Sequence, residues 1–336
     1  MSATRLRPWV GLALFLLFAA VVLALAPWVG MEWVAPADVL GGAAKPVESK
    51  IFWQLRVPRV LVAFLAGGGL ALCGMTFQAL FRNALATPFT LGVSSGAALG
   101  AALFVWLGVG VGLLGVSGMT VAAFVGAVGS MALVYGLTRL KGGFSTATLL
   151  LAGVAVNFTF ASLILFVQYM SNLHDAFRIL RWMMGGLEVT GYGQVLTVLP
   201  FVALGTAVLL FLVHDLNLLT TGEDLALSRG VAVGRVRVVL FVVCSLIVGG
   251  VVAVCGPIGF VGLMAPHICR LLIGPDHRVL APASLLFGGA FLVVCDAVAR
   301  TVIAPAEMPV GILTAMLGGP FFVWLLVSRT QGRTIV

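Results

Sequence analysis

Charged residues are scarce in this sequence. They make up 9% of its 336 residues, whereas a soluble domain carries about 25%. Hydrophobic residues reach 61%, above the usual content of about 45–50%. The composition excludes an ordinary soluble domain and predicts a chain whose solvent is lipid. The net charge of +8 does not indicate nucleic-acid binding, because the basic residues are scattered between apolar runs instead of gathered on one face.

Motifs that carry chemistry are also missing. The sequence has no GxxxxGK(S/T) phosphate-binding loop, so any energy from ATP must come from a partner. It has no HExxH pair, nucleophile elbow or paired intramembrane carboxylates. We therefore predict no catalytic site, no metal site and no cofactor. The cysteines lie in apolar segments without metal-ligand spacing: Cys73, Cys244, Cys255, Cys269 and Cys295.

Ten apolar runs are each near the roughly 20 residues that cross a bilayer as a helix. They predict one all-α integral membrane domain over 1–336, with ten transmembrane helices. The expected spans are 9–29, 58–80, 90–108, 117–138, 146–170, 193–213, 236–255, 257–272, 280–300 and 309–328. The first run has a cleaved signal peptide as its alternative, but it is long and lacks a clear small-residue cleavage site.

The basic residues divide unevenly between the two sides of this layout. One side carries Arg5, Arg7, Arg82, Arg139, Lys141, Arg229, Arg235, Arg237, Arg270, Arg278, Arg329 and Arg333. The other carries Lys45, Lys50, Arg56, Arg59, Arg178, Arg181 and Arg300. The positive-inside rule then puts both termini in the cytoplasm and requires an even number of spans.

Two glycine-rich stretches are alike: GGGLALCG at 67–74 and GGVVAVCG at 249–256. In the layout the first runs inward and the second outward, as in transporters built from inverted repeats. The match predicts that spans 2–5 and 7–10 are such repeats. The alternative is that these glycines serve only close helix packing.

Few ionisable residues fall within the spans. Asp296 and His267 are the candidates, and such groups serve proton relays in gradient-driven transporters. We prefer a simpler interpretation, in which Asp296 pairs with Arg300 one turn later and His267 satisfies a carbonyl of a broken helix.

The longest inner loop, residues 216–237, mixes acids, bases and glycine with apolar residues at helical spacing. Leu225, Leu227 and Val231 are expected to form one face of a short amphipathic helix that ends near Gly230. Such a face suits a soluble partner on the cytoplasmic side. A solvated connection is the alternative.

Three blocks, in the same order, resemble the FecCD-type permeases of type II ABC importers, and the resemblance extends essentially from end to end. The blocks are RVPRVLVAFLAGGGLALCGMTFQALFRNALATPFTLGVSSGAALG (56–100), GPIGFVGLMAPHICRLLIGPDHR (256–278) and PAEMPVGILTAMLGGPFFVWLL (305–326). The resemblance implies a permease of an ATP-driven importer that moves an iron chelate (ferric siderophore or haem) or cobalamin across the bacterial inner membrane. A gradient-driven secondary transporter of a large organic solute is the alternative from another class.

The resemblance also implies partners and site residues. It implies a homodimer in membrane lipid, two ATPase subunits, and a periplasmic or lipid-anchored substrate-binding protein. Docking of that protein falls on Arg56, Arg59 and Arg300, with interfacial snorkelling as the alternative. The inner gate of the translocation path falls on Asn83, Leu85, Ser145 and Thr146. ATPase coupling falls on Glu223, Ala226 and Gly230 within 216–237. The resemblance does not distinguish between an iron chelate and a corrinoid as the cargo.

Overall fold

A computed structural model describes residues 7–32, 34–41, 45–108, 112, 116–140 and 146–331. Its regular elements are helices, as lipid requires, because a helix satisfies its own backbone polar groups. In chain order they are α1 (Pro8–Leu25), η1 (Ala26–Trp28), α2 (Pro36–Gly41), α3 (Pro46–Lys50), η2 (Ile51–Arg56), α4 (Val57–Leu80), η3 (Pro88–Leu91), α5 (Val93–Trp106), α6 (Gly118–Leu140), α7 (Thr146–Met170), α8 (Leu173–Met183), α9 (Gly193–Phe211), α10 (Val213–Thr221), α11 (Glu223–Ser228), α12 (Val233–Cys255), α13 (Val261–Ile273), α14 (His277–Thr301) and α15 (Val310–Gln331).

Seven helical segments of the described chain are both long and apolar enough to cross a bilayer. Three further apolar helices are shorter: Val93–Trp106, Val261–Ile273 and Val310–Leu325. The prediction of an all-α membrane protein is confirmed. The count of ten spans stays a prediction, because these apolar stretches are only 10–17 residues long, less than the roughly 20 that cross a bilayer.

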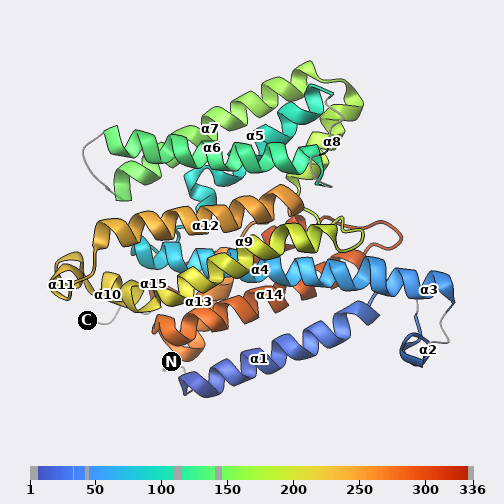
Figure 1. Ribbon diagram of the computed structural model, residues 1–336, viewed down its shortest axis with the longest axis horizontal. Coiled ribbons are helices and arrows are strands. Elements are labelled where there is room, and N and C mark those ends of the chain that lie inside the picture. The colour runs from blue at the N-terminus through green and yellow to red at the C-terminus, as the bar shows by residue number, and fades with distance from the viewer. Residues whose placement is uncertain are drawn as a thin grey trace.

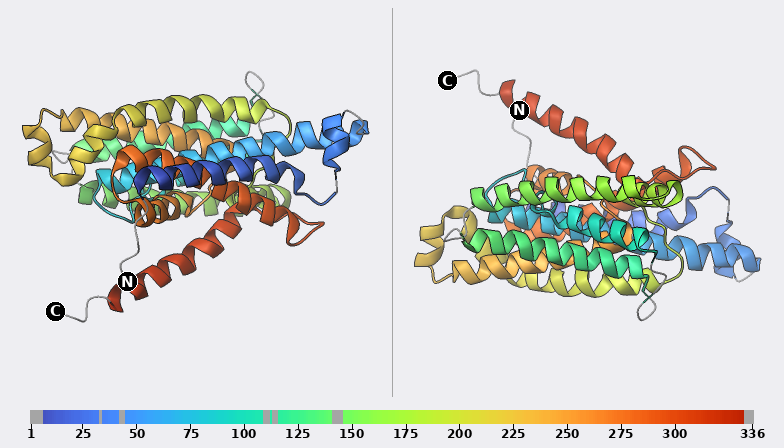
Figure 2. Two further views of the ribbon diagram at one scale, coloured as in Figure 1. Left: turned by 90° about the horizontal axis from the view of Figure 1, so that it is seen from below. Right: turned by 90° about the horizontal axis from the view of Figure 1, so that it is seen from above.

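Helix α4 lies at the centre of the bundle (Figure 1). It packs against α14, α13, α12 and α9, and α1 covers α14. Helices α5, α6, α7 and α8 form a second group, which meets the centre where α12 contacts α5 and α6. Helix α15 contacts α13 and α14, then diverges from the bundle towards its C-terminal end (Figure 2).

Glycines bring the central helices into backbone contact. A Cβ atom placed on Gly74 of α4 would lie 1.8 Å from the carbonyl oxygen of Gly262 in α13. One placed on Gly67 would lie 2.3 Å from the carbonyl oxygen of Gly288 in α14. Small residues permit this approach, which joins helices in lipid by packing. The close-packing role of these glycines is therefore present in the fold.

The two ends of the bundle carry different elements (Figure 1). We call one the α11 end, because α10 and α11 lie there, and the other the α2 end, because it carries α2, α3 and the turn 302–309. Helix α1 begins and α15 ends towards the α11 end (Figures 1 and 2).

Some features of the fold suit the predicted inverted repeat. Helix α4 begins at the α2 end and α12 at the α11 end, and each packs against the second and third helices of the other predicted repeat. Both second helices follow a left-handed residue, Gly92 (φ 86°) before α5 and Phe260 (φ 66°) before α13. The two matched glycine stretches, however, occupy different positions in their helices: Gly67 is the eleventh residue of α4, whereas Gly249 is the seventeenth of α12.

Candidate functional site

A buried ionic cluster lies at the α2 end, between α4 and α14. The Arg59 Nε donates to both carboxylate oxygens of Asp296, at 3.0 and 3.2 Å. The Nε of Arg300, one turn after Asp296, lies 3.1 Å from Asp296 Oδ2, which matches the predicted pairing of these two residues. Arg59 also reaches outwards, where its Nη1 lies 2.7 Å from Oε2 of Glu307 in the exposed turn 302–309. The buried carboxylate of Asp296 is thus shared by Arg59 and Arg300, and the more exposed Glu307 pairs with Arg59.

Arg56 is bound differently, although it is close in sequence. It is buried, and its guanidinium donates to the main-chain carbonyls of Pro27, Trp28 and Glu32. Gly30 leaves the room that this group needs, since a Cβ there would lie 2.7 Å from Arg56 Nη2. Arg56 therefore fastens the segment after α1 to the start of α4.

The three arginines predicted to dock a partner lie at the same end of the fold, and we call Arg56, Arg59 and Arg300 the basic cluster. Each is engaged within the chain, and Arg56 and Arg300 are almost fully buried. The Nη2 of Arg300 has no hydrogen-bond partner within the described part of the chain. That atom is buried, so Arg59, whose side chain is 15% exposed, is the member of the basic cluster most open to an incoming carboxylate.

The predicted coupling segment forms α10 and α11 at the opposite end. Gly222 alone joins the two helices, with φ 150°, a value that suits glycine. Glu223 forms a two-pronged ion pair with Arg237 of α12, with distances of 3.0 and 2.7 Å. Ala226 is fully buried, and Gly230 ends the segment in the left-handed region at φ 81°.

The expected amphipathic face of this segment was wrong in one residue. Leu225 and Leu227 are exposed, as a docking face needs, but Val231 is buried. Helix α11 ends at Ser228, so Val231 does not continue its face. The N–H of Val231 instead donates to the carbonyl of Ala226 at 3.0 Å and folds the chain back against the bundle.

Two polar contacts fasten α10 to the start of α14. The Asn217 Nδ2 donates to Asp276 Oδ1 at 2.8 Å, and the His277 main-chain N–H donates to Asn217 Oδ1 at 3.0 Å. Asp276 is the N-cap of α14 and accepts from the Arg278 N–H at 3.0 Å, which lowers the pKa of its carboxyl below the ordinary value.

The residues predicted to form the gate lie where α4 ends and α7 begins, both towards the α11 end (Figure 1). Asn83 Oδ1 accepts from the Leu85 N–H at 2.9 Å, and the Leu85 side chain is 61% exposed. Thr146 is the first residue of α7. Ser145 lies outside the described residues.

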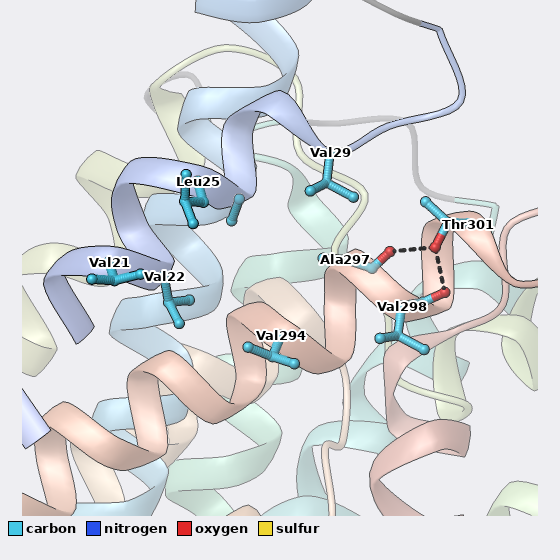
Figure 3. Close-up of a pocket in the computed structure, with 9 residues that line it drawn as sticks. Val21, Val22, Leu25, Val29, Val294, Ala297, Val298 and Thr301 are labelled. Carbon is cyan, nitrogen blue, oxygen red and sulfur yellow. Dashed lines mark hydrogen bonds between the residues drawn. The ribbon is translucent and has the colours of Figure 1, made fainter. Parts of the chain in front are cut away.

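Two pockets are lined mainly by apolar side chains. One, of about 300 Å³, lies between α1 and α14 (Figure 3). Its Thr301 hydroxyl is already bonded to the carbonyls of Ala297 and Val298. The other, of about 440 Å³, lies beside α5, α7 and α8, and there Ser95 Oγ donates to Asn157 Oδ1 at 2.7 Å. Neither lining set includes a charged side chain.

His267 is buried, with its ring 6.0 Å from that of Phe321. Its predicted role towards a carbonyl of a broken helix stays a prediction. No three His, Cys, Asp or Glu side chains come together as a metal-binding group in the ranges that the structure describes.

The fold defines a polytopic helical membrane protein, with an ionic cluster at one end and the exposed helix α11 at the other. The chain belongs to the FecCD transport family, whose profile matches residues 14–328. It is a permease subunit of an ABC importer and not an enzyme, and ATP hydrolysis belongs to a separate subunit. The alternative of a gradient-driven secondary transporter receives no support.

Relatives of the chain differ in their named cargo. It is 40% identical over 303 residues to the cobalamin import system permease protein BtuC of Halobacterium salinarum, covering 90% of this chain and 80% of that one. It is 39% identical over 289 residues to the hemin transport system permease protein HmuU of Yersinia pestis, covering 84% and 85%. A solved structure described as an inward-facing metal-chelate type ABC transporter superposes with a TM-score of 0.84 at 31% identity, over 94% of this chain and 98% of the other.

Proposed function

We propose that two copies of this chain form the membrane channel of an importer that carries an iron chelate or cobalamin across the bacterial inner membrane. A substrate-binding protein, periplasmic or lipid-anchored, docks on the basic cluster at the α2 end. Two ATPase subunits dock on α11 at the other end, which faces the cytoplasm together with both termini. Each subunit contributes ten spans, with helices 2–5 and 7–10 as inverted repeats.

One observation carries this proposal: the two surfaces expected to meet protein partners lie at opposite ends of an apolar bundle (Figure 1). The basic cluster lies at the start of α4 and the end of α14, whereas α11 exposes Leu225 and Leu227 at the far end. An importer that receives cargo on one side and energy on the other needs this separation.

The homodimer is supported by apolar side chains that a single chain leaves uncovered. On α7, Tyr169 is 87% exposed and Phe158 is 73% exposed, and α15 exposes Met316 and Trp324. Some of this surface faces lipid in any arrangement, as it does on other apolar helices. A second copy that faces α7 and α15 would place the path between the two chains, near Asn83, Leu85, Ser145 and Thr146 at its inner end.

The cargo is proposed as a class. Relatives named for hemin and for cobalamin are almost equally similar to the chain, so their names do not divide the two. Within the described residues no group of metal ligands is present to hold a bare ion, which suits a cargo that is already chelated.

Reconstitution tests the proposal. The full chain is placed in proteoliposomes with its ATPase and binding protein, and mass spectrometry identifies the ligand that the binding protein retains. We expect uptake of that ligand to require ATP, to be blocked by vanadate and to persist with an ionophore. Uptake that an ionophore abolishes while ATP is intact would contradict an ATP-driven importer.

Co-purification tests the coupling surface. The double variant Leu225→Asp, Leu227→Asp should release the ATPase from the membrane subunit, because it replaces the two exposed apolar side chains of α11 with charges. Ser228→Asp, in the same exposed turn, is the matched control and should retain the ATPase. Full retention by the double variant would mean that α11 is not the docking helix.

A further inference from the structure

The turn after α4 contains an arginine in an unusual backbone conformation. Arg82 has φ 47°, in the left-handed region that residues with a Cβ atom seldom adopt. It stands directly before Asn83 and Leu85, and we call residues 81–86 the gate turn. The Asn83 N–H donates to the carbonyl of Gln78 at 3.1 Å, so the gate turn is folded back on the end of α4.

The side chain of Arg82 leaves its own turn and binds another helix. Its Nε and Nη2 both donate to the main-chain carbonyl of Leu219, at 3.2 and 2.8 Å. Leu219 lies in the last turn of α10, where carbonyls lack a partner within the helix and the helix dipole favours a cation. The bond therefore joins the gate turn to the backbone of α10, and a substitution of the Leu219 side chain would leave its acceptor in place.

The connection between α10 and α11 is too short to absorb much movement of one helix relative to the other. Leu219 is three residues before Gly222, the single residue between the two helices. The buried Ala226 and the ion pair between Glu223 and Arg237 hold α11 to the bundle. A displacement of α11 thus acts on the C-terminal turn of α10, where the acceptor of Arg82 lies.

We propose that Arg82 is a positioning residue that couples the movement of α11 to the gate turn. It acts through Asn83 and Leu85 and does not itself touch the cargo. The proposal rests on the proposed function, in which α11 receives the ATPase and these two residues narrow the path. The two states are an Arg82 side chain bound to the Leu219 carbonyl and one released from it.

Site-specific labels test this coupling directly. A fluorescent thiol label is placed either on Leu85→Cys in the gate turn or on Ser228→Cys in α11, the exposed position expected to retain the ATPase. The native cysteines leave these labels unambiguous, since all five are buried. The complex of the full chain with its ATPase is then examined with ATP and with ATP plus vanadate, and uptake per ATP hydrolysed is measured in parallel for the unlabelled chain.

Three variants define the comparison. Arg82→Gly tolerates the left-handed backbone but removes the bond to Leu219, and Arg82→Lys keeps the charge and one donor group. Arg278→Gln is the matched control, because Arg278 Nη2 also contacts α10, at 3.1 Å from His214 Nδ1, but extends from α14 instead of the gate turn.

In the unmodified complex we expect nucleotide to change the signals at both positions. In Arg82→Gly the α11 label should still respond while the gate-turn label does not, and uptake per ATP hydrolysed should fall roughly 2- to 30-fold. Arg82→Lys should give a gate-turn response and an uptake ratio between those of the unmodified chain and of Arg82→Gly. Arg278→Gln should behave as the unmodified chain.

Two results would overturn the proposal. If the gate-turn label in Arg82→Gly follows nucleotide as before, or if Arg278→Gln uncouples to the same extent, Arg82 has no special role in transmission. These results leave the proposed function intact. If nucleotide moves neither label in the unmodified complex, α11 does not receive the ATPase, and both the proposed function and this inference fail.

Discussion

Asp296 is the residue on which the ionic cluster at the α2 end depends. It is buried and lies between the guanidinium groups of Arg59 and Arg300. Two cations at such close range are tolerated because one carboxylate serves both, and removal of one partner from a buried pair costs much more than the pair contributes.

Asp296→Asn should therefore destabilise the protein by about 3 kcal/mol or more. The amide keeps the shape of the side chain but leaves the buried Arg300 without its carboxylate and Arg59 with Glu307 as its remaining acid. The measurement is the thermal unfolding midpoint in detergent, with Asp38→Asn, an exposed acid at the same end, as the control. An unchanged midpoint for Asp296→Asn would show that the cluster does not need its negative charge.

Glu307→Gln should strengthen docking of the binding protein, whereas Asp296→Asn weakens the fold. Glu307 occupies Nη1 of Arg59, where a carboxylate of the binding protein would bind under the proposed function. Its removal should tighten docking roughly two- to fivefold at low salt, and less at high salt, because exposed ion pairs are weak and screened. Titration of the binding protein measures this, with Glu48→Gln, which pairs with Lys45, as the control. Weaker docking by Glu307→Gln would contradict the assignment.

The residue scale also shows how far local sequence rules reach. The pairing of Asp296 with Arg300 follows from their spacing of four residues on a helix. The bond from Arg59 to Asp296 spans 237 residues of chain, and the carbonyl acceptors of Arg56 are main-chain atoms without a sequence signal. The family resemblance pointed to these arginines, but their bonding partners could be identified only from the fold.

Among the elements, the contact between α4 and α13 is the most demanding. Gly74→Ala would place a methyl group against the Gly262 carbonyl, so one helix must move. We expect a loss of stability of roughly 1–3 kcal/mol, as for other overpacked cores. Gly129→Ala on α6 is the matched control, because nothing lies within 4 Å of its added Cβ. Relative to the unmodified protein, the unfolding midpoint should fall in Gly74→Ala and rise in Gly129→Ala. Equal shifts in the two variants would show that the contact is not tight.

Helix positions were predictable from hydropathy to within a few residues, and the exceptions have physical causes. The span expected at 257–272 begins as a helix only at Val261, because the backbone of Phe260 is left-handed and cannot belong to a right-handed helix. The span expected at 58–80 extends back to Pro46, because α3 and η2 continue the helix before the predicted apolar run. Hydropathy marks the segment that prefers lipid, not the full length of a helix.

At the scale of the whole molecule, orientation in the membrane is the main prediction. Single thiols are introduced as Ala306→Cys in the turn 302–309 and Leu225→Cys in α11, both at exposed positions. A membrane-impermeant thiol reagent on intact cells should modify only Ala306→Cys, and Leu225→Cys should react once the cells are opened. The unmodified chain is the blank, because its five thiols are buried. The reverse pattern would invert the proposed topology.

The backbone contacts of α4 set a limit on how this molecule can change shape. Helices that touch through main-chain atoms have no layer of side chains that can repack, so α4, α13 and α14 are expected to move as one rigid frame. Helix α15 lies against the Phe260 ring at Gly318, and its last ring contacts with the described residues of this frame are those of Phe321 with His267 and of Phe322 with Phe260. Pro320 interrupts the hydrogen bonds of α15 in the same region. The part of the described molecule that is most free to move is therefore the end of α15 beyond Phe322, which can change its angle relative to the rigid frame.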